Sequence, residues 1–148
     1  MPFASFAECA PDDIRYLFRL ANEDAQPHEA FLGQFTEMQL MSEKSEHTKE
    51  GWQATKYEYS TVFSGLRGNR LGFTERTSGK VEVKAIEVEG LSIPFFLPPV
   101  GEEAIFFFEL TDEGWLIRAG GCGGLWVKTN NPKVIEDAIF CLANDSEC

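Results

Sequence analysis

The apolar run Ala104-Ile105-Phe106-Phe107-Phe108 carries the strongest information about the fold, because five consecutive positions lack a polar side chain. Successive side chains of a strand point to opposite faces, so this run predicts a central strand that is covered on both faces. Asp112-Glu113-Gly114 predicts a turn, and Trp115 to Ala119 predicts a strand that returns antiparallel beside residues 104–110. We therefore expect a buried hairpin at the centre of the protein.

Upstream of this hairpin, the sequence indicates further strands of one sheet. Aromatic and β-branched residues alternate with polar ones from Tyr57 to Phe63, as in a half-buried strand. Leu71 and Phe73 continue the sheet, and Thr77-Ser78-Gly79-Lys80 predicts a tight hairpin turn because Gly79 tolerates a positive φ. The returning strand changes its alternation near Ala85-Ile86, which predicts a β-bulge there.

Helical signals occur on both sides of this sheet. Apolar spacing predicts a helix from Pro11 to Asp24, and Pro27 predicts a second, short helix that carries Ala30, Phe31 and Gln34. Residues 35–45 favour a strand weakly, and Leu125 to Thr129 favour the last strand. Asn131 and Pro132 are typical of the first positions of a final helix. The expected fold is one α+β domain over residues 1–148, with an antiparallel β-sheet meander flanked by N-terminal helices and one C-terminal helix.

Length and residue types narrow the cellular context. The chain has 148 residues, its first residues lack the basic start of a secretory leader, and no apolar stretch is long enough to span a membrane. Cys9, Cys122, Cys141 and Cys148 form no CxxC pair, so we expect free thiols in a reducing compartment, with Cys141 in the core. These features predict a cytoplasmic protein with no membrane association.

The net charge of −11 is the strongest feature of the composition. Residues 1–50 contain ten acids and four bases, residues 51–100 five and six, and residues 101–148 nine and three. The resulting charges are −6, +1 and −6, so two acidic regions flank a nearly neutral one. Such a field repels nucleic-acid phosphates and attracts basic surfaces. We expect a basic protein partner and no binding of nucleic acid.

Catalytic and cofactor motifs are not evident in the sequence. Gly120-Gly121-Cys122-Gly123-Gly124 resembles no phosphate-binding loop, because a predicted strand follows it where a helix would be needed. Cys122 would need a base to act as a nucleophile, and His28 and His47 share no motif with it and are interpreted as ordinary surface residues. We therefore predict no catalytic residue, cofactor or metal site, and hence no enzyme.

One surface combines acids with apolar residues in the predicted sheet. The antiparallel pairing places Glu102 and Glu103 at the same end of the hairpin as the Gly120–Gly124 loop. The proline-stiffened segment that contains Phe95 and Phe96 enters at that end, and charge with aromatic anchors is typical of protein interfaces. The predicted partner-binding residues are Phe95, Phe96, Glu102, Glu103, Asp112, Glu113 and Cys122. The alternative is that Phe95, Phe96 and Leu97 fold inward as a lid on the core.

These observations favour a small acidic protein-binding domain, of the immunity or antitoxin type, that binds and blocks a basic toxin or enzyme partner. A different class of function is a small-molecule-binding or enzymatic α+β domain in which the 13 phenylalanines line a pocket. A third is a subunit-assembly module that docks through the apolar loop. A pocket with a buried carboxylate or histidine would favour the second class over the first.

Overall fold

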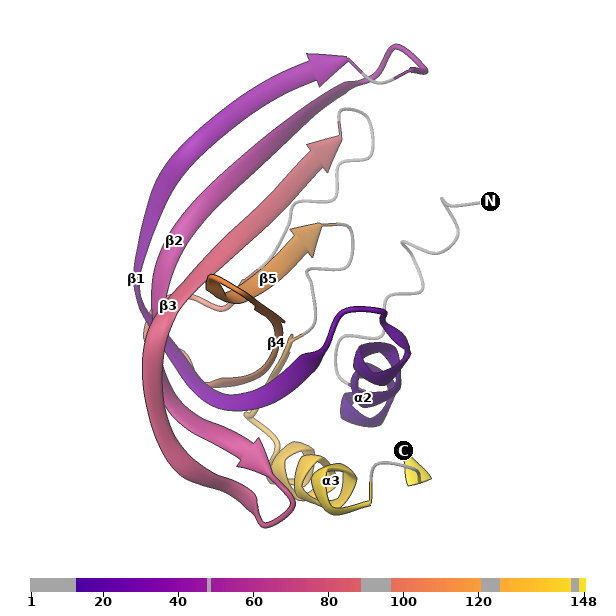
Figure 1. The fold of residues 1–148 in the computed structure, drawn as a ribbon, viewed down its shortest axis with the longest axis vertical. Helices are drawn as coiled ribbons and strands as arrows, with labels where there is room; N and C mark the ends of the chain where they lie inside the picture. The colour runs from indigo at the N-terminus through magenta and orange to yellow at the C-terminus, as the bar shows by residue number, and fades with distance from the viewer. Residues whose placement is uncertain (1–12, 48, 89–96, 121–125, 145–146) are drawn as a thin grey trace.

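A six-stranded sheet dominates the fold (Figure 1). Along the chain, one helix precedes its strands and another follows them. The computed structural model describes residues 13–47, 49–88, 97–120, 126–144 and 147–148. The elements in this part of the chain are α2 (Ile14–Glu23), β1 (His28–His47), β2 (Gln53–Asn69), β3 (Gly72–Val88), β4 (Ala104–Thr111), β5 (Gly114–Gly120), β6 (Trp126–Lys128) and α3 (Pro132–Ala143). The α+β class is confirmed.

The sheet is mixed and closes on itself, so the predicted antiparallel meander is wrong. Its strand order is β1-β2-β3-β5-β4-β6, and β1 pairs with β4 as well as with β2. β3 and β5 run parallel, whereas the other pairs are antiparallel. Five strands thus form a ring, because the long β1 contacts both β2 and β4.

The predicted hairpin of residues 104–110 and 115–119 is only partly correct. β4 and β5 pair only through residues 109–111 and 114–116, whereas β5 pairs with β3 from Trp115 to Gly120. The first residues of β4 pair instead with β6, in the register Ala104↔Lys128. The pairing of β5 with β3 is not predictable from the local sequence.

Two hydrophobic clusters lie on opposite faces of β4, which confirms that this strand is covered on both sides. Phe106 and Phe108 face the interior of the ring, where Phe31, Phe35 and Phe63 surround them. Ile105 and Phe107 face outward beneath the two helices. Because every residue from 104 to 108 is buried, β4 is the shared wall of both clusters.

The predicted helix at Pro27 is wrong, because Ala30, Phe31 and Gln34 belong to β1. The weakly favoured strand over residues 35–45 is confirmed as part of the same long strand. Phe31 and Phe35 are buried in the ring, and their spacing fits a helix as well as a strand. Pairing with β2 and β4 on both sides stabilises the strand.

The predicted turn at residues 77–80 is also wrong, since β3 runs without a break from Gly72 to Val88. The chain turns between Asn69 and Gly72, whose φ is 109°. Gly79 has a different role: a Cβ there would lie 3.0 Å from the Trp115 ring. No bulge occurs at Ala85-Ile86, because Ile86 continues the register with Lys56 and is 40% exposed.

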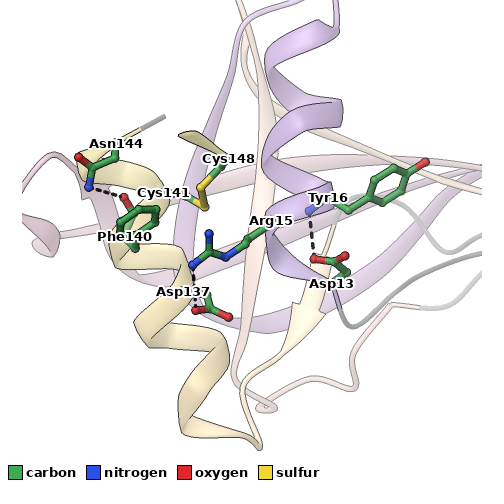
Figure 2. The surroundings of a disulfide bond; sticks show 8 residues. All are labelled: Asp13, Arg15, Tyr16, Asp137, Phe140, Cys141, Asn144 and Cys148. Atoms are coloured by element: carbon green, nitrogen blue, oxygen red, sulfur yellow. Dashed lines mark hydrogen bonds and ion pairs between the residues drawn. A yellow bond between two sulfur atoms is a disulfide. The ribbon is translucent and has the colours of Figure 1, made fainter. Parts of the chain in front are cut away.

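The two predicted helices are confirmed and pack side by side (Figure 1), although α2 begins at Ile14 instead of at Pro11, which lies outside the described residues. Asp13 caps α2 by accepting a hydrogen bond from the Tyr16 amide, and Asn131 caps α3 in the same way through Lys133. Figure 2 shows Arg15 of α2 paired with Asp137 of α3 at 3.5 Å. Neither of these described helices is long and apolar enough to cross a membrane.

Cys141 is buried as predicted, but the expectation of a free thiol is wrong. It forms a disulfide with Cys148, seven positions later in the chain (Figure 2). The bond joins α3 to the residues that follow it. Cys9 and Cys122 lie outside the described residues.

Candidate functional site

The predicted acidic residues lie at opposite ends of β4. Glu102 precedes the strand and pairs with Lys128 of β6 at 3.8 Å, while Glu103 accepts a hydrogen bond from Thr129 Oγ1 at 2.7 Å. Asp112 and Glu113 form the turn that follows Thr111. At about 3.3 Å per residue, the two acidic pairs are separated by roughly 25 to 30 Å. They therefore contribute to different surfaces.

The other predicted contact residues, Phe95, Phe96 and Cys122, lie outside the described part of the chain. The segment that follows Phe96 turns toward the core: Leu97 packs against the ring interior, and Pro98 is buried. The inward-folding alternative therefore holds for Leu97, and the interface prediction for the two phenylalanines stays a prediction.

A first hollow, here called the acidic hollow, lies against β2, β3 and the turn between β4 and β5. It has a volume of about 320 Å³, and its charged residues are Glu58, Glu82, Glu113 and Lys80. Glu58 and Glu82 alternate with the inward-facing residues of β2 and β3, so they face outward. Of the predicted residues, only Glu113 lines this hollow.

The carboxylates of the acidic hollow make no close ion pair within the described residues, although Lys84 lies opposite Glu58 in the β2–β3 register. Ion pairs within 4.0 Å in this part of the chain involve other acids, and Lys80 also takes part in none. Three carboxylates and one ammonium leave the hollow with a formal charge of −2. Met41, which is 61% exposed, adds an apolar rim.

A second hollow, here called the helix groove, lies between the end of α2 and the outer face of β4 and β5. It has a volume of about 310 Å³, with Asp24, His28, Glu109 and Arg118 as its charged or titratable residues. Leu20, Phe107 and Leu116 provide an apolar wall. The position of α2 forms one wall of the groove. Phe18 of α2 packs on Phe107, with 4.8 Å between the ring centroids, and the helix ends at Glu23.

Register explains why these polar side chains meet. His28 is opposite Glu109 in the β1–β4 pair, and Glu109 is opposite Leu116 in the β4–β5 pair. Directly opposed residues of antiparallel strands point to the same face, so the three side chains form a row across the sheet. Arg118, two residues beyond Leu116, reaches back to that row.

Glu109 is the most deeply buried charged residue of the groove, with 6% of its surface exposed. Its Oε2 accepts a hydrogen bond from Arg118 Nε at 3.1 Å, and the Arg118 side chain is 63% exposed. A buried carboxylate requires such a partner, because an unpaired one is costly to remove from water. The pair leaves the two Nη groups of Arg118 at the rim.

The phenylalanines of the ring interior line neither hollow, because they pack against one another. Within the described ranges, no group of three or more His, Cys, Asp or Glu residues has an arrangement that could hold a metal ion.

Sequence reasoning missed Glu109 and misjudged His28. Glu109 follows the apolar run and shares the parity of Ile105 and Phe107, so its burial could have been suspected. His28, interpreted as an ordinary surface residue, is half-buried in the groove. Its neighbours come from β4 and β5, about 80 positions later, and no local signal connects them.

Comparison with known proteins identifies no relative: no family model, no curated protein and no solved structure matches this chain.

Proposed function

We propose that this protein binds a basic protein partner and blocks it, in the manner of a small acidic immunity or antitoxin-type inhibitor. The observation that carries the proposal is the acidic hollow, where Glu58, Glu82 and Glu113 converge without ion-pair partners among the described residues. A lysine or arginine side chain of a partner would supply the missing positive charge.

The shape of the acidic hollow suits a long basic side chain. Lysine and arginine have apolar stems, and Met41 offers an apolar surface beside the carboxylates. Insertion of one charged anchor into a pocket is a common source of binding energy at interfaces.

The net charge of −11 supports the same proposal at longer range. It draws a basic protein toward this surface and raises the association rate, most strongly at low salt. Glu102 and Glu103, which already have polar partners on β6 and just beyond it, would act through this field. Asp112 would contribute to the field, and Glu113 would contribute both to the field and to the contact.

The test begins with capture of partners by the tagged full-length protein from its native extract at low salt, followed by elution with rising salt. Binding kinetics of the captured protein are then measured against a triple variant, Glu58→Gln with Glu82→Gln and Glu113→Gln. A matched variant, Glu50→Gln with Glu75→Gln and Glu136→Gln, loses the same charge at exposed positions outside the hollow. The captured protein's own activity is assayed with and without this protein.

We expect the hollow variant to weaken binding by roughly 30-fold or more, mainly through faster dissociation. The matched variant should slow association a few-fold and leave dissociation unchanged. Equal losses in both variants would show that net charge alone acts, and capture of no basic protein would refute the proposal.

Small-ligand binding is the second candidate function, and the helix groove favours it. The buried carboxylate of Glu109 and the neighbouring His28 are the features that would favour this class over a purely protein-binding surface.

A further inference from the structure

The free polar groups of the helix groove indicate what kind of ligand it accepts. Asp24 Oδ1 accepts a hydrogen bond from the Gln26 amide at 2.9 Å, which leaves its second oxygen available. Glu109 uses Oε2 for Arg118, which leaves Oε1. Arg118 uses Nε, which leaves its Nη donors. Among the described residues, the groove therefore offers two carboxylate oxygens and one cationic fork.

His28 adds a third acceptor in its neutral form. Its Nδ1 lies 2.8 Å from the carbonyl oxygen of Gln26, and a carbonyl oxygen can only accept a hydrogen bond. Nδ1 must therefore carry the proton, so the neutral ring has Nε2 as an acceptor. Three acceptors that line one hollow match in number the three N–H donors of an ammonium group.

The end of α2 strengthens the preference for a cation at this side of the groove. A helix carries a partial negative charge at its C-terminus, and α2 has no basic residue in its last turn. Asp24, the C-cap residue, adds a full negative charge at the same place. This arrangement is unfavourable when the site is empty and becomes favourable when an ammonium group binds.

We infer that the helix groove binds a free α-amino acid with an apolar side chain. The ammonium group binds to Asp24, Glu109 and His28, and the carboxylate binds to the Nη groups of Arg118. The side chain packs against Leu20, Phe107 and Leu116. A volume of about 310 Å³ restricts the site to a compact ligand. This site is independent of the protein-binding function proposed above.

The ligand test uses isothermal titration calorimetry on the full-length protein with L-valine, L-leucine, L-methionine and L-phenylalanine. The best of these is compared with two analogues of the same side chain, one without the carboxylate and one without the amine. For leucine, these are 3-methylbutylamine and 4-methylpentanoate. We expect both analogues to bind at least about tenfold more weakly than the amino acid.

Two conservative variants locate the site. Asp24→Asn keeps an oxygen for the Gln26 amide but removes the charge, and Arg118→Lys keeps a charge near Glu109 but removes the two-pronged fork. Each should weaken amino-acid binding by at least about tenfold while circular dichroism and melting temperature stay close to those of the wild type. The triple variant at Glu50, Glu75 and Glu136 serves as the control and should bind normally.

The inference fails if none of the four amino acids binds at concentrations up to about 10 mM, which is weaker than a specific site requires. It also fails if either analogue binds as tightly as the amino acid, because recognition of both charged ends is then absent. Normal binding by both groove variants would overturn the location.

Discussion

At the scale of single residues, two glycines determine how closely β1 and β2 approach. Gly33 and Gly65 are register partners. A Cβ on Gly33 would lie 2.3 Å from the Ser64 carbonyl oxygen, and one on Gly65 would lie 2.2 Å from that of Leu32. Both neighbours are backbone atoms within a paired sheet, so they cannot move without disturbing the strands.

Gly33→Ala should therefore destabilise the protein by more than about 2 kcal/mol in free energy of unfolding. Gly51→Ala is the contrasting variant, because a Cβ there meets nothing within 4 Å although its φ is 83°. Its cost should be only about 1 kcal/mol, from backbone strain alone. Urea unfolding of both variants measures the difference; similar losses would contradict the close contact at Gly33.

Tyr57 and Glu87 form a pH-sensitive pair on β2 and β3. The Tyr57 hydroxyl donates to Glu87 Oε2 at 3.3 Å. Burial raises the pKa of Tyr57 above its ordinary 10.0, and the charge of Glu87 and this hydrogen bond raise the pKa further. The native state thus holds the phenolic proton more tightly than the unfolded chain does.

Stability from Tyr57 should be fully present below pH 10, the ordinary pKa, and should be lost as pH rises through the higher native pKa. Glu87→Gln should lower the tyrosine pKa, measured by tyrosinate absorbance, because it removes the negative charge. Glu43→Gln should lower it less, since Glu43 is a weaker cause. Circular dichroism at each pH confirms that the titrating state is folded, and an unchanged titration in Glu87→Gln would exclude this pairing.

Residue-scale prediction from sequence succeeded where the signal is local. The caps Asn131 and Asp13 act within their own helices, and the local sequence predicts Asn131 correctly. The local sequence predicts a turn at Gly79, whereas its lack of a side chain makes room for Trp115, more than 30 positions later. His28 gains its role from Glu109 in the same non-local way.

At the scale of elements, α3 depends on the disulfide as well as on its apolar side. Ala138 and Cys141 are its buried residues, while Ile139 is 40% exposed. Cys148 packs against the same cluster as α2 and α3. The Cys141–Cys148 bond keeps that contact in place (Figure 2).

Cys148→Ala should lower the free energy of unfolding by about 2 kcal/mol, because the short loop it opens gains entropy in the unfolded chain. The measurement is thermal unfolding with and without a reducing agent. Reduction should lower the melting temperature of the wild type and leave that of Cys148→Ala almost unchanged, apart from any contribution of Cys9 and Cys122. A variant as stable as the oxidised wild type would show that this bond adds no stability.

Strands and helices whose apolar residues lie on one face could be predicted from the sequence. The single long strand from His28 to His47 could be predicted only in its second half. The apolar residues in the first half of this segment have a spacing that also suits a helix. The segment forms a strand because it pairs with β2 on one edge and with β4 on the other. The pairing of β4 was predicted only in part: residues 109–111 lie beside β5 as hairpin proximity predicts, whereas residues 104–106 lie between β1 and β6.

At the scale of the whole molecule, the pairing of β3 with β5 brings residues of the two hollows next to each other in the sheet. Glu82 of the acidic hollow is the register partner of Leu116 of the helix groove. A meander would have separated these residues, so the sequence could suggest acids and a buried strand but not the two sites. The net charge of −11 follows from the composition. The grouping of three acidic side chains in one hollow depends on the contact between β2, β3 and the β4–β5 turn, which the sequence does not predict.

The β1–β4 pairing also has a consequence in time. It joins residues 28–33 to residues 104–109, so the partners lie between 71 positions apart (33 to 104) and 81 positions apart (28 to 109). A pairing this distant cannot form on the ribosome until β4 has emerged, and it slows folding because a long loop must close first. During synthesis, Phe31 and Phe35 therefore lack their final packing partners until β4 has been made. In that interval their exposed rings make the nascent chain prone to aggregation.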